Sequence, residues 1–441
     1  MNASASVLSE NTALLPQFST SLDFALDCDA ADILAPYRKQ FALPRGKNGG
    51  PLVYMCGHSL GLAPHAALDY VSEELAEWAE LGVAGHHTAT RPWIDYAQNF
   101  TKGLVHVTGS LPSEVVAMNS LTINLHLMMA SFYRPVGVRD KILIEAGAFS
   151  SDRHAILGQI AWHRLEAEGT LIELEPRRGE ETLRLEDIEA KIAELDSELA
   201  LVLWPGVQYR TGQAFDCEAI TRAAHGVGAI AGFDMAHAIG NLPLSLHDWN
   251  VDFAVWCSYK YLNAGPGAIG GCFVHEQHFA SAPSRLSGWW GHEPQTRFQM
   301  MPEFRPATGA AGWAVSNPPI LSAAPLIASL DMFRQAGIEE LRAKSMRLTA
   351  YTERLMLERC DGEVQIITPT APAERGCQLS FRVSGGARRG RRIFDALSSR
   401  GIMCDWREPD IIRIAPAPLY NRFVDVYELV EQLSTALKEI A

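Results

Sequence analysis

Short apolar runs alternate with amphipathic stretches through the middle of the chain, from about residue 114 to residue 274. Most runs are apolar at nearly every position, as expected for strands that are covered on both faces. Helical patterns lie between them, for example at Arg184–Leu195 and Cys217–His225. The predicted strands are Val115–Met118, Lys141–Glu145, Leu171–Leu174, Ala200–Trp204, Ala229–Phe233, Phe253–Cys257 and Gly271–Val274. This alternation predicts an α/β fold with a mostly parallel, seven-stranded sheet flanked by helices.

The pattern changes towards the C-terminus. Pro318, Pro319 and Pro325 are expected to break the chain before a helix from about Ser329 to Glu358. Beyond Glu363 we expect strands at Val364–Ile367, Cys377–Val383 and Ile411–Ile414, and helices at Arg391–Arg400 and Val424–Ile440. The sequence therefore predicts an N-terminal arm (1–60), a large domain (61–330) and a smaller C-terminal α+β domain (331–441).

Composition narrows the functional class. The 441 residues include 47% hydrophobic and 20% charged residues, which is typical of a soluble globular protein. A formal net charge of -13 argues against a nucleic-acid partner, and the run Arg388–Arg392 is better explained as a solvated helix start. No apolar run is long enough for a membrane span. The first thirty residues carry acidic groups but no Lys or Arg, and the eight cysteines are scattered. We expect a cytoplasmic protein with reduced thiols.

Polar and aromatic residues follow several of the predicted strands. Sheets of this kind bind ligands beyond the carboxyl ends of their strands. Thr122 follows the first strand at the start of a helix, and the stretch 149–152 follows the second. Asp234 and His237 follow the fifth strand, and Lys260 follows the sixth. These groups are expected to converge on one edge of the sheet.

The residues at that edge match the demands of pyridoxal phosphate, which needs a lysine for its aldehyde, an acid beside the pyridine nitrogen, a stacking partner and a phosphate cradle. Lys260 and Asp234 supply the first two, and Phe149 can cover the ring. Thr122 and the backbone N–H groups of its helix offer a phosphate site, and Tyr259 can bind the phosphate and later donate a proton. Taken singly, each has an ordinary alternative as a helix cap, a solvated charge or a core residue. The hypothesis depends on their combination.

Two longer motifs contain these residues: GFDMAHAIGN at 232–241 and WCSYKYLNAG at 256–265. Further motifs are NLH at 124–126, FSSD at 149–152, YRTGQ at 209–213, GWWGH at 288–292, SNPPIL at 316–321 and RIAP at 413–416. In this order they resemble the motifs of kynureninases, a family within the class V aminotransferase-like group of pyridoxal-phosphate enzymes. The resemblance runs from about Cys56 to the C-terminus.

The resemblance implies a fold-type-I transferase architecture and a homodimer with shared active sites. It implies catalytic roles for Lys260 and Tyr259. The implied cofactor-binding residues are Leu121, Thr122, Phe149, Ser150, Ser151, Asp152, Asp234, His237, Tyr259 and Lys260, with Trp289 and Asn317 from the partner subunit. The implied substrate-binding residues are Arg413, at the α-carboxylate, and Ser59, His86, Ser316 and Asn317.

Two positions depart from the family pattern. Kynureninases commonly have Asn where this chain has His58, within GHSLG at 57–61. A second cofactor contact, often a small hydroxyl residue, is Pro205 here, so a side-chain hydrogen bond is lost at that point. We expect altered cofactor binding rather than loss of activity.

The implied reaction is hydrolytic Cβ–Cγ cleavage of L-kynurenine or 3-hydroxy-L-kynurenine, giving anthranilate or 3-hydroxyanthranilate plus L-alanine. This would place the enzyme in the kynurenine pathway of tryptophan catabolism and NAD biosynthesis. His86, Ser316 and Asn317 resemble the set found in members that prefer the 3-hydroxy substrate. We expect the same preference here, because polar groups can form hydrogen bonds with the extra ring hydroxyl. Alternatively, His86, which lies next to His87, is an ordinary polar residue of a loop.

Two other functions stay open at this point. A cysteine desulfurase of the same superfamily would need a mobile cysteine near the cofactor, whereas Cys257 is expected in a buried strand. The second open function is that of a non-catalytic protein that keeps the cofactor fold. The complete set of catalytic and binding residues argues against it: Lys260, Asp234, His237, Tyr259 and Arg413. No His/Cys/Asp cluster has metal spacing in the sequence, and a monovalent cation near the cofactor is left open.

Overall fold

The computed structural model describes residues 18–47, 49–281 and 284–440. Backbone contacts divide the chain into two units. The described parts of residues 1–65, 207–214 and 335–441 form unit 1, and residues 66–206 and 215–334 form unit 2. The residues before position 66 thus share a unit with the C-terminal residues. The domain boundaries drawn from the sequence stay a proposal.

A seven-stranded sheet runs through unit 2, with the order β4-β10-β9-β8-β7-β5-β6. Its strands are β4 (Val115–Ala117), β5 (Lys141–Glu145), β6 (Leu171–Leu174), β7 (Leu199–Pro205), β8 (Ile230–Asp234), β9 (Phe253–Trp256) and β10 (Gly271–Val274). Strands β9, β8, β7, β5 and β6 are parallel to one another, whereas β10 is antiparallel to both β9 and β4. The prediction of a mostly parallel seven-stranded sheet is confirmed.

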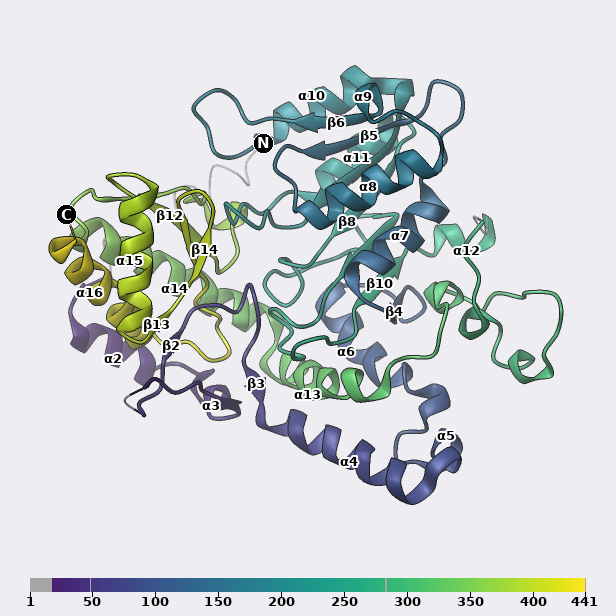
Figure 1. The fold of residues 1–441 in the computed structure, drawn as a ribbon, viewed down its shortest axis with the longest axis horizontal. Coiled ribbons are helices and arrows are strands. Elements are labelled where there is room, and N and C mark those ends of the chain that lie inside the picture. The colour runs from purple at the N-terminus through teal and green to yellow at the C-terminus, as the bar shows by residue number, and fades with distance from the viewer. Residues whose placement is uncertain (1–17, 48, 282–283, 441) are drawn as a thin grey trace. The chain divides into compact units, whose positions relative to one another are not determined.

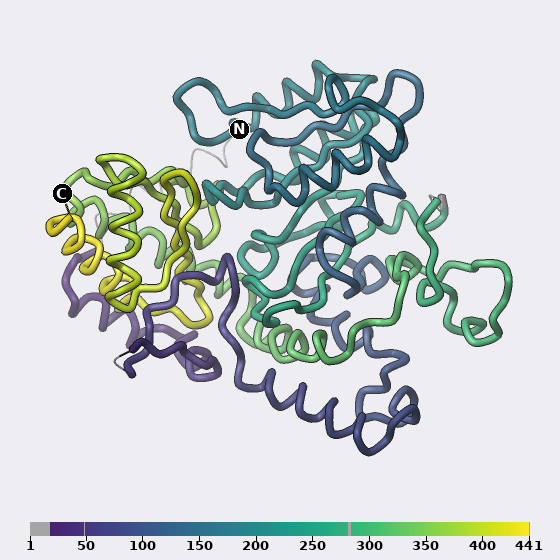
Figure 2. Tube along the Cα trace, viewed as in Figure 1, coloured from purple at the N-terminus to yellow at the C-terminus, as the bar shows by residue number. Residues whose placement is uncertain are grey.

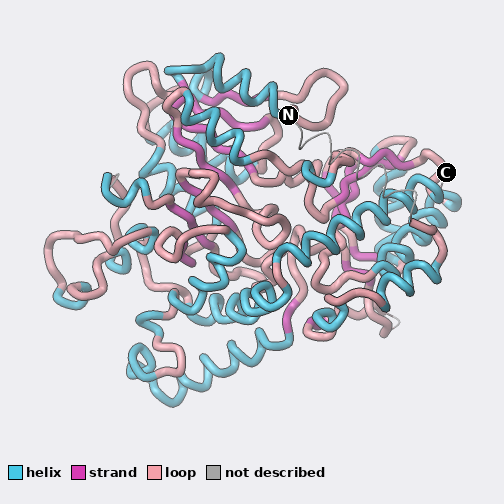
Figure 3. The backbone as a smooth tube through the Cα atoms, turned by 180° about the vertical axis from the view of Figure 1, so that it is seen from behind, coloured by secondary structure: helices cyan, strands magenta, loops and turns pink. Residues whose placement is uncertain are grey.

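Helices flank this sheet (Figures 1 and 3). The α-helices within residues 65–336 are α4 (His65–Leu81), α5 (Gly85–Thr88), α6 (Gln98–Thr108), α7 (Leu121–Phe132), α8 (Ser150–Trp162), α9 (Ala167–Thr170), α10 (Leu185–Leu195), α11 (Cys217–Gly226), α12 (Gln277–Ser281) and α13 (Ile320–Ala336), of which α4 and α5 lie away from the sheet. Helix α11 contacts α10 and β8, and α7 contacts α8, β9 and β10. Asp216 begins α11 by accepting the Ala219 N–H. One cluster of buried residues joins α7 to the strands, including Leu125, Met128, Leu201 and Val255.

The helix after Pro319 differs from the prediction. The structure has two helices, α13 (Ile320–Ala336) and α14 (Ile338–Arg359), divided at Gly337, whose φ of 78° suits glycine. Pro325 lies inside α13, so the predicted break at Pro325 is wrong. A proline removes only one helical hydrogen bond. Burial of its neighbours Ala323, Ala324 and Leu326, at 0% exposure each, offsets that loss.

Unit 1 contains an antiparallel sheet of four strands in the order β11-β12-β15-β14. These are β11 (Val364–Ile366), β12 (Leu379–Val383), β15 (Ile411–Ile414) and β14 (Asp405–Arg407). Helix α16 (Phe423–Glu439) packs against α14, α15 (Ala387–Ser399) and α2 (Leu22–Ala30), so the purple and yellow ends of the colour scale lie side by side (Figure 2). The predicted C-terminal α+β fold is confirmed.

Short N-terminal elements complete unit 1. Strand β2 (Val53–Tyr54) pairs in parallel with β13 (Ile402–Met403), and β1 (Phe41–Ala42) pairs with β3 (Ala63–Pro64). Helix α3 covers Ala35–Arg38. Across the residues that the structure describes, none of the helices is both long and apolar enough to cross a bilayer.

Candidate functional site

The carboxyl ends of β8 and β9 place Asp234 and Lys260 in unit 2. Strand β8 is closely packed, since a Cβ at Gly232 would lie 2.1 Å from the ring of Phe253. Asp234 is the last residue of β8, and Lys260 follows β9 by four residues, after Trp256. The Lys260 Nζ atom lies 3.2 Å from His237 Nε2. The strand ends therefore bring the predicted lysine and histidine together.

Two aromatic rings accompany the lysine. The Lys260 Nζ atom lies 5.8 Å from the centroid of the Phe149 ring and 5.8 Å from that of Tyr259. Phe149 is 39% exposed, so it is not a core residue but presents a face that a ligand could cover. Burial raises the pKa of the Tyr259 hydroxyl, and the neighbouring Cys257 thiol adds to the effect. Tyr259 is thus held in its proton-bearing form.

Three carboxyl groups are crowded near Lys260. Asp234 and Asp152 are both 8% exposed, and Asp234 Oδ1 accepts the Ala236 N–H at 2.7 Å. Burial raises the pKa of Asp152, and the negative charge of Asp234 raises it further. Burial likewise raises the pKa of Glu145, at the end of β5, to about 8. Such a cluster favours a cationic ligand, because a positive charge would stabilise the ionised forms.

Hydroxyl and backbone groups lie at the start of α7. Thr122 is in its first turn, and its Oγ1 is 2.7 Å from Ser151 Oγ at the start of α8. The Ser120 side chain does not cap α7. A Cβ at Gly270 would lie 2.8 Å from the Trp256 carbonyl oxygen and 3.2 Å from the Leu121 backbone nitrogen, so glycine lets that loop pass close to the start of α7. Helix N-termini with hydroxyls of this kind suit a phosphate group.

Four other predicted residues of unit 2 lie at the surface. His86, Trp289, Ser316 and Asn317 are exposed. The His86 ring packs edge-on to Trp93 at 5.4 Å, and the Trp289 indole donates to the Arg297 carbonyl at 3.0 Å. Within the described residues, none of the four makes a hydrogen bond or ring contact with Lys260. The arrival of Trp289 and Asn317 from a partner subunit stays a prediction.

Ser59 and Arg413 belong to unit 1. Arg413 lies on β15 with a side chain only 1% exposed. Its guanidinium donates to the Tyr209 carbonyl at 2.5 Å and to Asp405 at 2.8 Å. The half-buried Ser59 lies in a turn and donates its backbone N–H to the Cys56 carbonyl at 2.8 Å.

The two departures from the family pattern also have defined places. Pro205 ends β7 and pairs in register with Asp234 of β8. It offers neither an N–H nor a hydroxyl beside that carboxylate. His58 lies in unit 1, is fully buried, and its Nε2 is 3.8 Å from Asp405 Oδ2.

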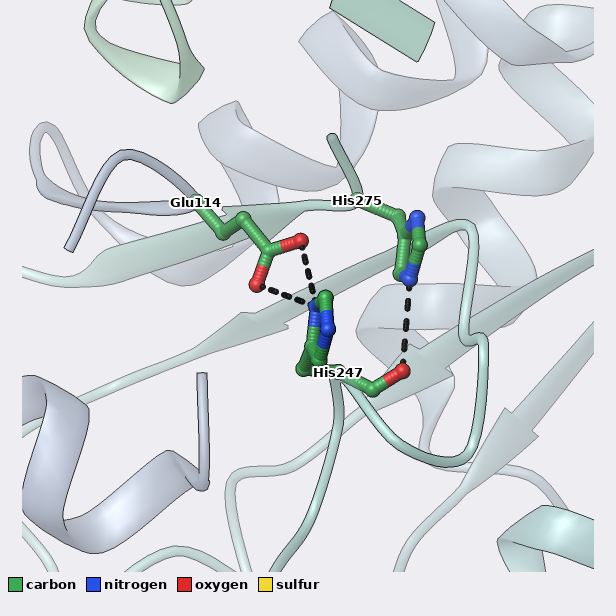
Figure 4. A group of neighbouring side chains, drawn as sticks. All are labelled: Glu114, His247 and His275. Atoms are coloured by element: carbon green, nitrogen blue, oxygen red, sulfur yellow. Dashed lines mark hydrogen bonds and ion pairs between the residues drawn. The ribbon is translucent and has the colours of Figure 1, made fainter. Parts of the chain in front are cut away.

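A second group of titratable residues, which sequence reasoning missed, lies at the amino edge of the same sheet. Glu114 directly precedes β4, His275 directly follows β10, and His247 lies in the turn before β9, yet the three side chains come together (Figure 4). His247 Nδ1 lies 3.0 and 3.1 Å from the two oxygens of Glu114, and the two imidazole rings stack at 5.0 Å. Nearby, Asp252 contacts His225 at 2.8 Å and His278 at 2.7 Å. Neither group corresponds to a short sequence motif.

Hydrogen bonds within the chain explain why Glu114, His247 and His275 lie together. The Glu114 oxygens also accept the N–H groups of Leu111 and Glu276 at 2.8 and 2.9 Å. His275 Nε2 contacts the His247 carbonyl, and its Nδ1 accepts the Gln277 N–H, both at 3.2 Å. With both imidazole nitrogens of His275 engaged and the rings stacked rather than convergent, the arrangement is that of a structural network.

Comparison with known proteins identifies the family. The model of the kynureninase C-terminal domain matches residues 341–433. A kynureninase of Xanthomonas campestris pv. campestris (strain B100) is 56% identical over 415 residues, which cover 94% of this chain and 98% of that protein. The chain belongs to the kynureninase family. The resemblance seen in the motifs is confirmed.

Solved structures support the same fold for this kynureninase-family chain. The apo structure of a cysteine desulfurase from Thermococcus onnurineus NA1 matches with a TM-score of 0.74 at 18% identity, covering 88% of this chain and 95% of that one. A structure described as the C-DES mutant K223A with glycine covalently linked to the PLP cofactor also has a TM-score of 0.74, at 18% identity, covering 92% and 99%. The fold is therefore that of fold-type-I enzymes, as expected.

The cysteine desulfurase alternative is not favoured. Its solved representatives are distant in sequence from this chain. All eight cysteines are buried. Burial raises the pKa of Cys257, the cysteine nearest to Lys260 in sequence. A thiol of this kind is poorly suited to nucleophilic attack.

Proposed function

We propose that this chain is a kynureninase, a pyridoxal-phosphate-dependent hydrolase that cleaves the Cβ–Cγ bond of L-kynurenine or its 3-hydroxy form. The products are anthranilate or 3-hydroxyanthranilate and L-alanine. The observation that carries the proposal is the 56% identity to a kynureninase over 94% of the chain. The set of Lys260, His237, Asp234 and Phe149 at one edge of the sheet supports it independently.

The residues at this edge fit pyridoxal phosphate. Asp152 Oδ1 is buried, with no hydrogen-bond partner among the described residues, in the crowded carboxyl cluster. A protonated pyridine ring would supply the positive charge that these carboxyl groups lack. In this proposal Asp234 and His237 attend the pyridine ring, the stretch Phe149, Ser150, Ser151 and Asp152 lines it, and Leu121, Thr122 and Tyr259 hold the phosphate.

The proposed mechanism assigns proton transfers to two residues. When bound, the cofactor supplies the electron sink for bond cleavage at the substrate carbons. Lys260 would hold the cofactor aldehyde, and its amine is the base assigned to the substrate α-proton. Asp234 keeps the pyridine nitrogen protonated. Tyr259 keeps its proton until it is donated to the β-carbon, consistent with the raised pKa of its buried hydroxyl. Water adds at the γ-carbonyl, and the aromatic acid leaves.

In this proposal a few polar and charged residues recognise the substrate. Arg413 binds the α-carboxylate, a role that suits its planar guanidinium. Ser59, His86, Ser316 and Asn317 contact the aromatic half, and Trp289 and Asn317 act from the partner subunit of a homodimer. The enzyme acts in the cytoplasm, in the kynurenine pathway.

The decisive experiment uses the purified enzyme loaded with pyridoxal phosphate. Incubation with L-kynurenine and with 3-hydroxy-L-kynurenine should release alanine and the matching anthranilate. Release of sulfide from cysteine, without cleavage of either substrate, would instead support a desulfurase. Absence of turnover, with a cofactor absorbance band that does not shift when substrate is added, would support a non-catalytic protein.

Substrate preference is a finer prediction. Because His86, Ser316 and Asn317 are polar, kcat/KM should be higher for 3-hydroxy-L-kynurenine, by roughly tenfold, than for L-kynurenine. Parallel steady-state measurements on both substrates check this. Faster turnover of unsubstituted kynurenine would reject the preference but leave the reaction type intact.

A further inference from the structure

Arg413 is part of a charged group that no motif predicted. Its cross-strand partner is Asp405: strands β14 and β15 are antiparallel, and these two residues are opposite each other in register. Arg413 Nη2 lies 2.8 Å from Asp405 Oδ2, and Nη1 donates to the Tyr209 carbonyl. The side chain of Arg413 is 1% exposed and that of Asp405 is 13% exposed. The guanidinium is therefore held from two sides inside unit 1.

Burial explains why a carboxylate lies there. A guanidinium removed from water without a counter-charge is costly, and breaking a buried pair typically costs about 3–5 kcal/mol. Asp405 offsets that cost before any substrate carboxylate arrives. Two fixed acceptors, one on the neighbouring strand and one at Tyr209, also set the plane of the guanidinium. A planar group aligned in advance binds a carboxylate with less loss of side-chain entropy.

His58 lies close to the same carboxylate. Its Nε2 is 3.8 Å from Asp405 Oδ2, the oxygen that also accepts from Arg413. The charged and titratable groups near Asp405 are Arg413, Arg407, His58, Cys56 and Cys404. Arg407 is 3.2 Å from the other oxygen, Oδ1. Burial raises the pKa of Cys56 to about 12, so it stays a neutral thiol.

The turn that carries His58 is fixed to the same strand end. The Ala415 N–H donates to the Met55 carbonyl at 2.8 Å, two residues beyond Arg413. A Cβ at Gly57 would lie 2.4 Å from the Tyr420 hydroxyl, so the turn packs closely at this point. The turn that places His58 near Asp405 is therefore fixed by a backbone hydrogen bond at Met55 and by close packing at Gly57. The turn also carries Ser59, one of the proposed substrate residues.

We propose that Asp405 is the positioning residue for Arg413, and that His58, where kynureninases commonly have Asn, holds Asp405 in place. The inference deepens the proposed function and rests on it, since it assumes that Arg413 binds the substrate carboxylate. Neither Asp405 nor His58 touches the reacting atoms. Their loss should therefore raise KM while kcat changes little.

The test compares variants of the holoenzyme acting on L-kynurenine. Asp405→Asn keeps the volume but removes the charge, and should raise KM by about tenfold or more with kcat within about threefold. Asp405→Glu should recover part of the affinity. His58→Asn should raise KM by about threefold. The matched control is Asp410→Asn, which breaks the Arg382–Asp410 pair, 2.9 Å long and also in unit 1, and should leave KM unchanged.

The outcomes separate the two proposals. If the parent enzyme cleaves neither kynurenine, the proposed function fails. If the parent enzyme is active but Asp405→Asn has an unchanged KM, or loses kcat alone, only the positioning role is overturned. A KM raised equally by Asp410→Asn would also overturn it, because the effect would then be a general loss of unit 1 stability. Should Asp405→Asn fail to fold, the KM of His58→Asn decides in the same way.

Discussion

Buried carboxyl groups at the two edges of the unit 2 sheet have pKa values that are shifted in opposite directions. At the amino edge, Asp252 is 3% exposed but receives hydrogen bonds from His225, His278 and the Ala231 N–H. Although burial opposes it, these bonds lower the pKa of Asp252. At the carboxyl edge, burial and the charge of Asp234 raise the pKa of Asp152.

This difference in pKa shift indicates which edge contributes to the stability of the fold and which edge is suited to binding a ligand. Carboxylates with a full set of donors hold strands together and leave nothing for a ligand to add. Carboxyl groups crowded together lower the stability of the folded chain, and a bound cation would offset that loss. The amino edge is thus expected to carry stability, and the carboxyl edge to carry activity. The same residue type, Asp, serves both, so its neighbours decide its role.

The largest expected effect is at Lys260. Lys260→Ala should reduce kynurenine turnover by about 10⁴-fold or more, because the variant lacks the amine that is proposed to hold the cofactor and take the α-proton. Its melting temperature without cofactor should stay within about 2 °C of the parent value. Steady-state kinetics and thermal unfolding measure both. The control is Lys191→Ala, on the exposed face of α10, which should have full activity.

Asp234→Asn should have the next largest effect. It removes the charge that keeps the pyridine nitrogen protonated, so turnover should fall by about 10²- to 10³-fold. Without cofactor, stability should be unchanged or higher, because one like charge has left the cluster with Asp152 and Glu145. Chemical denaturation of the cofactor-free protein tests this. A large loss of stability with retained turnover would contradict the division between the two edges.

Asp252→Ala should show the reverse behaviour. Removing the acceptor of His225, His278 and a backbone N–H should lower the free energy of unfolding by about 2–4 kcal/mol. Because the folded pKa is lowered, the contribution of Asp252 is present above its usual pKa and is lost as pH falls through the folded value. The difference from the parent protein should therefore shrink in acid. Asp248→Ala, an exposed neighbour, is the control.

The smallest expected effect is that of Glu145→Gln. The pKa of Glu145 is raised from its model-peptide value of 4.5 to about 8. The folded state then binds the extra proton between those values, so the parent protein should lose stability as pH rises from 5 to 8. The variant should lack that loss and should therefore be more stable than the parent protein near pH 8. Equal pH dependence of the two proteins would show that Glu145 is ionised in the fold.

Sequence patterns were most informative where one face of a strand or one motif decides the structure. The run Lys141–Glu145 is apolar at its centre and matches β5. Strand ends then placed Lys260 near His237 without any knowledge of distances. Motifs of this kind are local, and the α/β fold converts local order into a common edge.

The remaining features depend on distant residues. Glu114 and His247 are 133 positions apart, and nothing local pairs them. Pro325 predicts a helix break by its chemistry, but burial of the residues around it keeps α13 continuous. Asp405 meets Arg413 only through the register of two strands. In each case tertiary packing, rather than local preference, determines the outcome.

The pairing of β2 with β13 has a consequence for synthesis of the chain. These strands are separated by about 350 positions, yet they pair in parallel as Val53 with Ile402. All of unit 2 emerges from the ribosome between them. Unit 2 therefore has time to fold first, at synthesis rates of about 5–20 residues per second. The segment around β2 must wait, still unpaired, until the C-terminal strands have been translated.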